Sequence, residues 1–382
     1  MADTILLTGA TGLLGRYLIK DLLSSEVPLA VVVRPNRKNS ASERVAAIMA
    51  TWENELGRKL PRPTVFSGDL TAPCLGLSQK DLQWVERHCD LLLHNAASLS
   101  FQSAGKDSEP WRTNVEGTSH VLDLCEKTGI HDFHHVSTAY VCGLRTGVIR
   151  EDELDEGQEF GNDYERSKVE AENLVRNASF LAPPTFYRPS IIIGDSKTGF
   201  TSTFHGFYVT LRLAYTLLNS PEFSNKDSIY TTRITLNGNE HKNFVPVDWV
   251  SAVISQVLQN RKHHGKTYHL TADTPVTTQT IIDVLESSLD FSGTVLHGAD
   301  KPIENANLLE QIFYENMQVY DAYWRHDPQF EKSNTFEAAP SLPCPVVDED
   351  LLNRLSQCAI EMSFRWKDRV PAAENFTSLQ PK

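Results

Sequence analysis

Short apolar runs alternate along the first half of the chain with longer stretches in which apolar positions recur at a helical spacing. The apolar runs predict strands at 5–8, 29–34, 64–69, 90–97, 133–138 and 185–194. The stretches between them predict helices at 12–24, 42–57, 78–87, 111–128 and 162–178. Strands that are apolar throughout indicate a parallel sheet buried on both faces, with the helices as crossovers. We therefore expect a doubly wound α/β fold of the Rossmann type.

The alternation becomes irregular after about residue 195. The later pattern predicts a helix near 203–219, strands near 229–236, a strand end and a helix over 245–258, and helical stretches at 273–289, 304–322 and 348–364. We expect a sheet domain made of residues 1–200, to which residues 244–270 return. Residues 201–243 and 271–382 are expected to form a smaller, mostly helical domain.

The amino-acid composition limits the classes of ligand that the protein is expected to bind. The chain has 382 residues, of which 40% are hydrophobic and 22% charged, so it can bury a large core. The 36 basic and 49 acidic residues give a net charge of -13, which argues against binding to nucleic acid or to anionic membranes. Six cysteines without paired spacing predict reduced thiols. Since no signal peptide or membrane span is visible, we expect a cytoplasmic protein that binds small molecules.

The first strand is followed at once by TGATGLLG, in which Gly9, Gly12 and Gly15 are three residues apart. Glycine between a strand and a helix permits a tight turn and the close approach of a pyrophosphate, which the helix N-terminus binds. The spacing GxxGxxG differs from the commonest dinucleotide fingerprint, and a glycine-rich turn can be a simple connection. Its position at the start of a strand–helix–strand unit favours dinucleotide binding.

The end of the second strand indicates which dinucleotide is bound. An acidic residue there binds the ribose 2′-hydroxyl of NAD, whereas arginine accommodates the 2′-phosphate of NADP. The strand ends in Arg34, Arg44 stands at a predicted helix start, and no acidic residue occurs between Arg34 and Glu43. We therefore expect NADP(H) as the cofactor. Arg37 and Lys38 are interpreted as solvated loop side chains.

Tyr164 and Lys168 are four residues apart on a predicted helix, so their side chains share one face. A neighbouring ammonium stabilises a phenolate and brings the pKa of the phenol toward the working range. The pattern YxxxK is common by chance, but Ser137 and Thr138 end the fifth strand, at the sheet edge where such folds bind ligands. A hydroxyl and a tyrosine together can bind the oxygen of a carbonyl group while a nicotinamide reduces that group.

In this order the motifs resemble the extended short-chain dehydrogenase/reductase superfamily. The resemblance covers roughly residues 4–260, through TGATGLLG, GDL at 68–70, HNAA at 94–97, TNVEGT at 113–118, STAYVCG and YERSK. It implies that Thr138, rather than Ser137, is the catalytic hydroxyl. Tyr164 is then the proton donor and Lys168 its partner. The resemblance also implies that Asn114 supports this lysine.

The same resemblance implies the residues that contact the cofactor, with Asp69 at the adenine and Ala96 and Ala97 along the channel. The full set expected there is Thr8, Gly9, Thr11, Gly12, Leu13, Leu14, Gly15, Arg34, Arg44, Asp69, Leu70, Asn95, Ala96, Ala97, Tyr164, Lys168, Arg188, Pro189 and Ser190. The sheet domain is accordingly expected to bind NADP, and the smaller domain the substrate. No metal site is expected, because His131, His134 and His135 lack a carboxylate or cysteine at ligand spacing.

Within the superfamily the chain looks most like the thioester reductase and fatty acyl-CoA reductase branch, the male-sterility type. The motifs that carry this likeness are TGATGLLGRYL, VVVRP, HNAASLSF, VSTAYVCG, YRPSIIIGDSKTGF, NFVPVDWV and, more loosely, residues 320–335. The likeness implies a free-standing enzyme that reduces an acyl thioester of CoA or of a phosphopantetheinyl carrier protein to an aldehyde, with further reduction to the alcohol left open. The alternatives are an alcohol or hydroxysteroid-like dehydrogenase, a nucleotide-sugar epimerase or dehydratase, and a non-catalytic NADP-binding regulator.

Two further stretches carry alternative interpretations. Phe200, Phe204, Phe207 and Tyr208 predict core packing, with the lining of an acyl pocket as the alternative. The acidic run at 151–160 predicts an exposed loop before the Tyr164 helix, in a position that also suits a lid.

Overall fold

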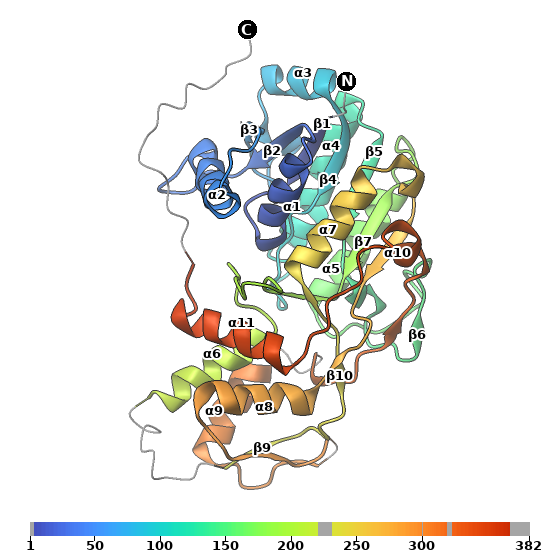
Figure 1. Ribbon diagram of the computed structural model, residues 1–382. Helices are drawn as coiled ribbons and strands as arrows, with labels where there is room; N and C mark the ends of the chain where they lie inside the picture. The colour runs from blue at the N-terminus through green and yellow to red at the C-terminus, as the bar shows by residue number, and fades with distance from the viewer. Residues whose placement is uncertain (1–3, 221–230, 300, 319–322, 367–382) are drawn as a thin grey trace.

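The computed structural model describes residues 4–220, 231–299, 301–318 and 323–366 (Figure 1). It has a larger lobe, at the top of Figure 1, and a smaller lobe below it. None of the helices in the described part of the chain has the length and apolar character that a membrane crossing needs.

A seven-stranded sheet forms the centre of the larger lobe. Its strands are β1 (Thr4–Thr8), β2 (Leu29–Val33), β3 (Thr64–Ser67), β4 (Cys89–His94), β5 (Asp132–Val136), β7 (Thr185–Pro189) and β12 (Thr267–Leu270). Their order is β12-β7-β5-β4-β1-β2-β3, and all neighbouring strands are parallel. The strand order reverses between β1 and β4, where such folds bind ligands at the carboxyl ends of the strands. The predicted doubly wound, Rossmann-type α/β fold is confirmed.

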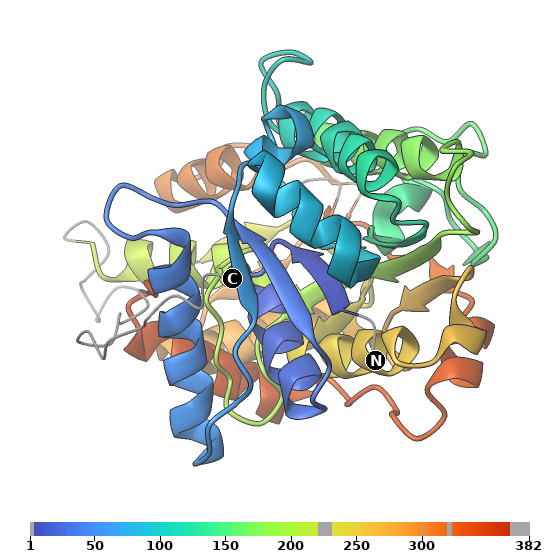
Figure 2. The same ribbon diagram turned by 90° about the horizontal axis from the view of Figure 1, so that it is seen from above.

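Helices cover both faces of this sheet (Figure 2). One face carries α1 (Leu13–Ser24), α2 (Ala41–Leu56) and α7 (Val247–Leu258), and the other carries α3 (Gln79–His88), α4 (Gly117–Thr128) and α5 (Asp163–Arg176). Successive side chains of a strand point to opposite faces. Leu7 of β1 therefore packs with the first group of helices and Leu6 with the second. Burial on both faces explains why the strands are apolar throughout.

The structure divides two elements that the sequence predicts as continuous. The strand expected at 185–194 leaves the large sheet after Pro189, and β8 (Ile191–Ile193) then pairs with β11 (Phe244–Pro246). The helix expected at 111–128 begins with a π-helical turn, η2 (Arg112–Glu116), before α4. The first division starts the smaller lobe, because β8 leads directly away from the sheet.

The smaller lobe is mainly helical. It contains α6 (Phe207–Leu218), α8 (Thr278–Leu289), α9 (Leu308–Met317) and α11 (Glu349–Glu361), with β9 (Thr232–Ile234) paired to β14 (Thr294–Leu296) and β10 (His241–Lys242) paired to β13 (Val276–Thr277). Phe207 and Tyr208 are buried in its core, and Phe204 packs against them. Residues 229–230 of the predicted strand and 319–322 of the predicted helix lie outside the described residues.

The chain after α9 returns to the larger lobe before it forms α11. There β15 (Gln329–Phe330) pairs with β6 (Val148–Ile149), and α10 (Ser333–Ala338) follows. Glu151, in the acidic run expected to be an exposed loop, is buried. Its carboxylate accepts hydrogen bonds from His269 N at 3.0 Å and Asn334 N at 2.8 Å. The start of that run therefore anchors the returning chain to β12.

Candidate active site

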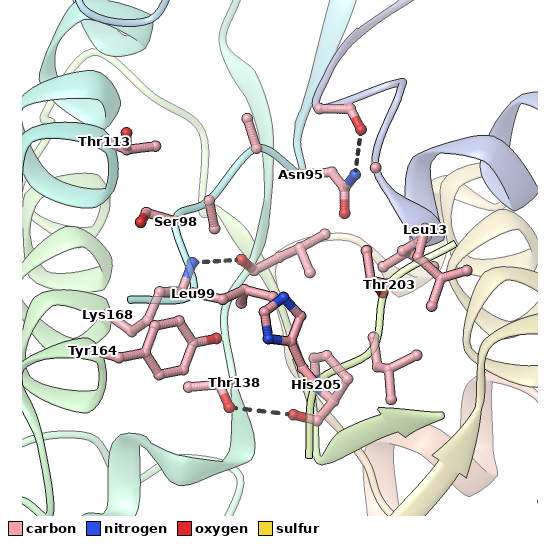
Figure 3. Close-up of a pocket in the computed structure, with 18 of the residues that line it drawn as sticks. Leu13, Asn95, Ser98, Leu99, Thr113, Thr138, Tyr164, Lys168, Thr203 and His205 are labelled. Carbon is pink, nitrogen blue, oxygen red and sulfur yellow. Dashed lines mark hydrogen bonds between the residues drawn. The ribbon is translucent and has the colours of Figure 1, made fainter. Parts of the chain in front are cut away.

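A cavity of about 710 Å³ lies at the carboxyl ends of the parallel strands and reaches into the smaller lobe (Figure 3). Thr138 lines it, as do most residues that the sequence places at the cofactor: Thr8, Gly9, Thr11, Gly12, Leu13, Leu14, Arg34, Arg44, Asp69, Leu70, Asn95, Ala96, Ala97, Tyr164, Lys168, Pro189 and Ser190. The glycine turn and the Tyr164 helix, far apart in the sequence, thus face one space.

The three glycines of the turn have different environments. Gly9 has a positive φ of 71°, and a Cβ there would lie 2.6 Å from Ala96 N. A Cβ at Gly15 would lie 2.1 Å from Gly9 O, so this glycine lets α1 pack against the turn. A Cβ at Gly12 would stand at the cavity wall, with its nearest neighbour, Gly9 O, 3.5 Å away. The turn therefore exposes bare backbone to the cavity at the N-terminus of α1, a geometry suited to a pyrophosphate.

Two arginines stand at the end of the cavity beside β2. The Arg34 guanidinium lies 3.9 Å from the Asp69 carboxylate, and both side chains remain substantially exposed. Arg44 donates hydrogen bonds to Arg34 O and, at 2.9 Å, to Thr11 Oγ1. Asp69 Oδ1 accepts from Thr71 N at 3.0 Å. Positive charge is thus held where the ribose of a dinucleotide would lie in this fold.

The end of the cavity beside β5 contains Thr138, which follows β5, and Tyr164 on α5. Thr138 Oγ1 donates to Pro189 O at 3.4 Å, and its side chain hydrogen-bonds that of Tyr164. Burial raises the pKa of Tyr164 to about 12, and the hydrogen bond with Thr138 opposes this only in part. The lowering of this pKa expected from Lys168 is not found, because burial and the charge of Glu165 raise the pKa. The phenol is therefore protonated at neutral pH.

Lys168 lines the cavity and is 2% exposed. Its Nζ donates to Val136 O at 2.8 Å and lies 3.4 Å from His135 Nε2. Burial lowers the pKa of Lys168 to about 8, although Glu172 raises it. Burial and the charge of this lysine lower the pKa of His94 to about 3 and that of His135 well below its usual value. Both imidazoles are thus neutral at neutral pH, and the lysine carries the local positive charge.

Three residues named from the sequence lie behind the cavity wall. Gly15 packs against the turn, as described above. Asn114 is buried, and its Nδ2 donates to Ser98 O at 3.1 Å and to Ser167 Oγ at 2.9 Å. Arg188 is also buried, and its Nη2 lies 2.6 Å from Glu172 Oε1. Asn114 therefore holds a cavity loop against α5, whereas Arg188 forms an internal ion pair.

The sequence analysis linked residues 320–335 loosely to the family but did not predict that this segment closes the cavity beside Tyr164. Tyr323 and Trp324 come from the C-terminal part of the chain and line the cavity. The ring of Tyr323 lies 5.1 Å from that of Phe101, which lies 5.9 Å from that of Tyr164. These rings form an aromatic wall beside the phenol. The sequence does not predict this wall, because its members meet only in the folded chain.

Asp327 anchors this closing segment. Its carboxylate accepts hydrogen bonds from Tyr140 Oη and from Lys242 Nζ, each at 2.9 Å. All three side chains are buried, and Tyr140 and Lys242 also line the cavity. His205, from the loop before α6, points into the same space in Figure 3. The smaller lobe and the closing segment therefore complete the cavity that the sheet domain begins.

A separate polar cluster lies at the other end of β5. Asp132 Oδ2 lies 2.9 Å from His264 Nδ1, and its Oδ1 lies 3.2 Å from His134 Nε2. The carboxylate that the sequence analysis found lacking near His134 is therefore present, one residue beyond His131. In this structure the three groups pair with one another, and Asp132 has a lowered pKa because its hydrogen bonds to both histidines outweigh burial.

Comparison with known proteins identifies the family. The model of the male sterility protein family, an NAD-binding domain, matches residues 7–254, which is more than half of the chain. A nonribosomal peptide synthetase of Aspergillus flavus, asaC, is 25% identical over 71% of this chain and 26% of its own length. The aldehyde reductase lnaA of the same fungus is 24% identical over 92% of this chain and 35% of its own length. The chain thus spans about a quarter to a third of these two relatives.

A solved structure shows the same fold. The terminal R domain from the myxalamid PKS-NRPS biosynthetic pathway superposes with a TM-score of 0.76 and 26% identity, over 96% of this chain and 92% of that domain. The resemblance inferred from the motifs is confirmed. The chain belongs to the male sterility protein family of NAD-binding domains, within the extended short-chain dehydrogenases/reductases.

Proposed function

We propose that this protein is an NADPH-dependent reductase that converts an acyl thioester into an aldehyde and a free thiol. The observation that carries the proposal is that Thr138, Tyr164 and Lys168 line the same cavity as the glycine turn. Relatives named as an aldehyde reductase and a nonribosomal peptide synthetase, and the likeness to a terminal R domain, support this chemistry. CoA or a phosphopantetheinyl carrier protein is the proposed carrier of the acyl group.

The residues present fit NADP(H). The bare backbone at Gly12 suits the pyrophosphate, Arg34 and Arg44 suit the 2′-phosphate, and Lys168 suits the nicotinamide ribose. When bound, the nicotinamide supplies the hydride that reduces the carbonyl carbon of the thioester.

The protein's own contribution is to hold the carbonyl oxygen and to move a proton. The hydroxyls of Thr138 and Tyr164 donate hydrogen bonds to this oxygen, and the phenol gives its proton as the oxygen becomes an alkoxide. A phenol with a pKa of about 12 keeps its proton until that negative charge develops. When the hemithioacetal collapses, its hydroxyl proton returns to Tyr164, the C–S bond breaks, and the thiolate takes a proton from solvent.

Loss of NADPH absorbance tests this function directly. Acyl-CoA, an acyl thioester on a phosphopantetheinyl carrier protein, and the free aldehyde are supplied in parallel. We expect consumption with at least one thioester, with release of one thiol for each aldehyde formed. If no thioester is consumed while the aldehyde is, the protein is a carbonyl reductase and the thioester proposal is wrong.

The preference for NADP over NAD depends on Arg34 in this account. Replacing it by alanine removes a charge-assisted contact with the 2′-phosphate, which is worth about 1.5–3 kcal/mol. We expect Arg34→Ala to weaken NADPH binding roughly ten- to a hundredfold and to leave NADH binding nearly unchanged. Titration of both cofactors by fluorescence measures this. Arg37→Ala is the control, because that exposed arginine does not line the cavity; an equal loss in both variants would refute the assignment.

NADPH binding should depend on pH through Lys168. Its pKa is lowered to about 8, so the positive charge is lost as the pH rises through that value. We expect the Kd of NADPH to increase above about pH 8, by up to tenfold for each pH unit. Lys168→Met, which has no charge to lose, should bind NADPH more weakly and with no such dependence. A Kd for the parent protein that stays constant from neutral to alkaline pH would contradict this role.

We propose that the two parts of the chain bind different ligands. Residues 1–200 with 244–270 bind NADP(H), whereas 201–243 and 271–382 bind the substrate. Supporting this, the smaller lobe contributes Phe207, Ile281 and Met317 to the cavity.

The six cysteines are free thiols, which fits a reducing compartment, and we propose a cytoplasmic location.

A further inference from the structure

A second, smaller cavity of about 90 Å³ adjoins the catalytic one inside the smaller lobe. Thr210, Ile281 and Trp324 line both cavities, so these three side chains stand between them. We call the smaller space the rear cavity; α6, α8 and α9 contribute most of its lining, including Ala214, Leu217, Leu285, Leu289 and Phe313. It is therefore adjacent to the site of the proposed reaction, with only these side chains between them.

The residues that line the rear cavity favour an apolar ligand such as a hydrocarbon chain. Among the described residues that line it, Glu286 carries the only charge. The Oε1 atom of this glutamate already accepts hydrogen bonds from Gly293 N at 3.0 Å and Thr294 N at 2.8 Å. The other lining groups are aliphatic or aromatic side chains and threonines. A polar ligand would lose its hydration there without comparable compensation, whereas an apolar one would gain by leaving water.

Helix α6 shows that this space is incompletely filled by the protein itself. In the first half of α6, Tyr208 and Leu211 are 1% and 0% exposed. Toward the end of the same helix, Ala214, Leu217 and Leu218, which line the rear cavity, are only partly buried. An apolar surface that is left partly open beside a reaction cavity favours a ligand that covers it.

The wall of the catalytic cavity is also apolar in this direction. Phe244, Ile281 and Met317 line it, and Ile281 and Trp324 also line the rear cavity. We propose that the rear cavity receives the far end of the substrate's acyl chain, so that the enzyme selects thioesters of extended straight-chain acyl groups over short ones. This inference rests on the proposed thioester reduction and adds the substrate class to it.

A series of acyl-CoA thioesters of increasing chain length tests the proposal. For the parent protein we expect kcat/KM to rise about fourfold for each methylene that reaches the rear cavity, following the transfer free energy of a buried methylene group. Ala214→Trp fills the rear cavity from a residue that does not line the catalytic one. This variant should lose the increase for long chains and keep the parent's kcat/KM for short chains.

Thr216→Trp is the matched control, because it places the same bulk on the exposed side of α6. It should retain the parent's dependence on chain length. Ala214→Leu fills the same cavity with a smaller side chain. The Tm of every variant is measured as well, so that an effect of filling the cavity can be distinguished from loss of the fold. If kcat/KM is independent of chain length in the parent, or if Ala214→Trp lowers it equally for all chains, the proposal is wrong.

Binding of straight-chain aldehydes, measured as a rise in Tm, makes the test independent of thioester turnover. The rise should grow with chain length in the parent and in Thr216→Trp, but not in Ala214→Trp. If this dependence is found while no thioester is reduced, the proposed function fails and the assignment of the rear cavity stands. If thioesters are reduced but neither turnover nor binding depends on chain length, only the rear-cavity assignment fails.

Discussion

Tyr164→Phe should lower kcat/KM for thioester reduction by about 10²–10⁴-fold, the usual contribution of a positioned general acid. The variant removes only the hydroxyl that gives its proton to the carbonyl oxygen. The ring keeps its place against Phe101, 5.9 Å away, so the wall of the cavity is preserved. We therefore expect NADPH affinity and Tm to remain close to those of the parent, with the loss confined to turnover. Steady-state kinetics and cofactor titration measure the two effects separately.

Tyr187→Phe is the control for this experiment. It also removes one phenolic hydroxyl from a buried tyrosine, but that hydroxyl lies 2.9 Å from His134 Nδ1 on β5, away from the cavity. Activity of this variant should match that of the parent at temperatures where both are folded. If Tyr164→Phe is as active as Tyr187→Phe, proton donation does not come from Tyr164.

Arg188→Met should lower the free energy of unfolding by about 3–5 kcal/mol. Arg188 donates to Glu172 from Nη2 at 2.6 Å and from Nε at 3.2 Å, and both side chains are 0% exposed. Burial raises the pKa of Glu172, but the charge and hydrogen bonds of Arg188 and Arg176 lower it on balance, so the carboxylate is ionised. Without Arg188 its negative charge is buried with the partly exposed Arg176 as its remaining ion-pair partner. Denaturant unfolding measures the loss.

The double variant Arg188→Met/Glu172→Leu tests the cause of this loss. Since it removes both buried charges, it should recover most of the stability. NADPH affinity should be nearly unchanged in Arg188→Met itself, because Arg188 lies behind the cavity wall. If Arg188→Met instead keeps its stability and loses NADPH affinity, the role that the sequence motif suggested for Arg188 at the cofactor is correct.

Features that depend on neighbours along the chain were predictable from the sequence. The turn between β1 and α1 is one, because its glycines act within a few residues of one another. Thr138 is another, since the end of a buried parallel strand lies at the ligand-binding edge in this fold. Tyr164 and Lys168 share a face of α5 for the same local reason.

Features that depend on distant contacts were not predictable. β12 is a short strand, TYHL, whose burial relies on Glu151 and on the returning chain. Arg188 follows the motif of a cofactor contact, yet Glu172 on α5 holds its guanidinium. The high pKa of Tyr164 results from burial that no spacing reveals. Tyr323 joins the aromatic wall only because Asp327 fastens its segment to two residues far away in the sequence.

The most direct measurement uses NADPH deuterated at the transferable position of the nicotinamide, with an acyl thioester as substrate. The account predicts that the aldehyde carries one deuterium at its former thioester carbon, that one thiol is released for each NADPH oxidised, and that Tyr164→Phe slows label transfer by at least a hundredfold. Thiol release with no deuterium in the product, or label transfer at the parent's rate in Tyr164→Phe, would contradict it.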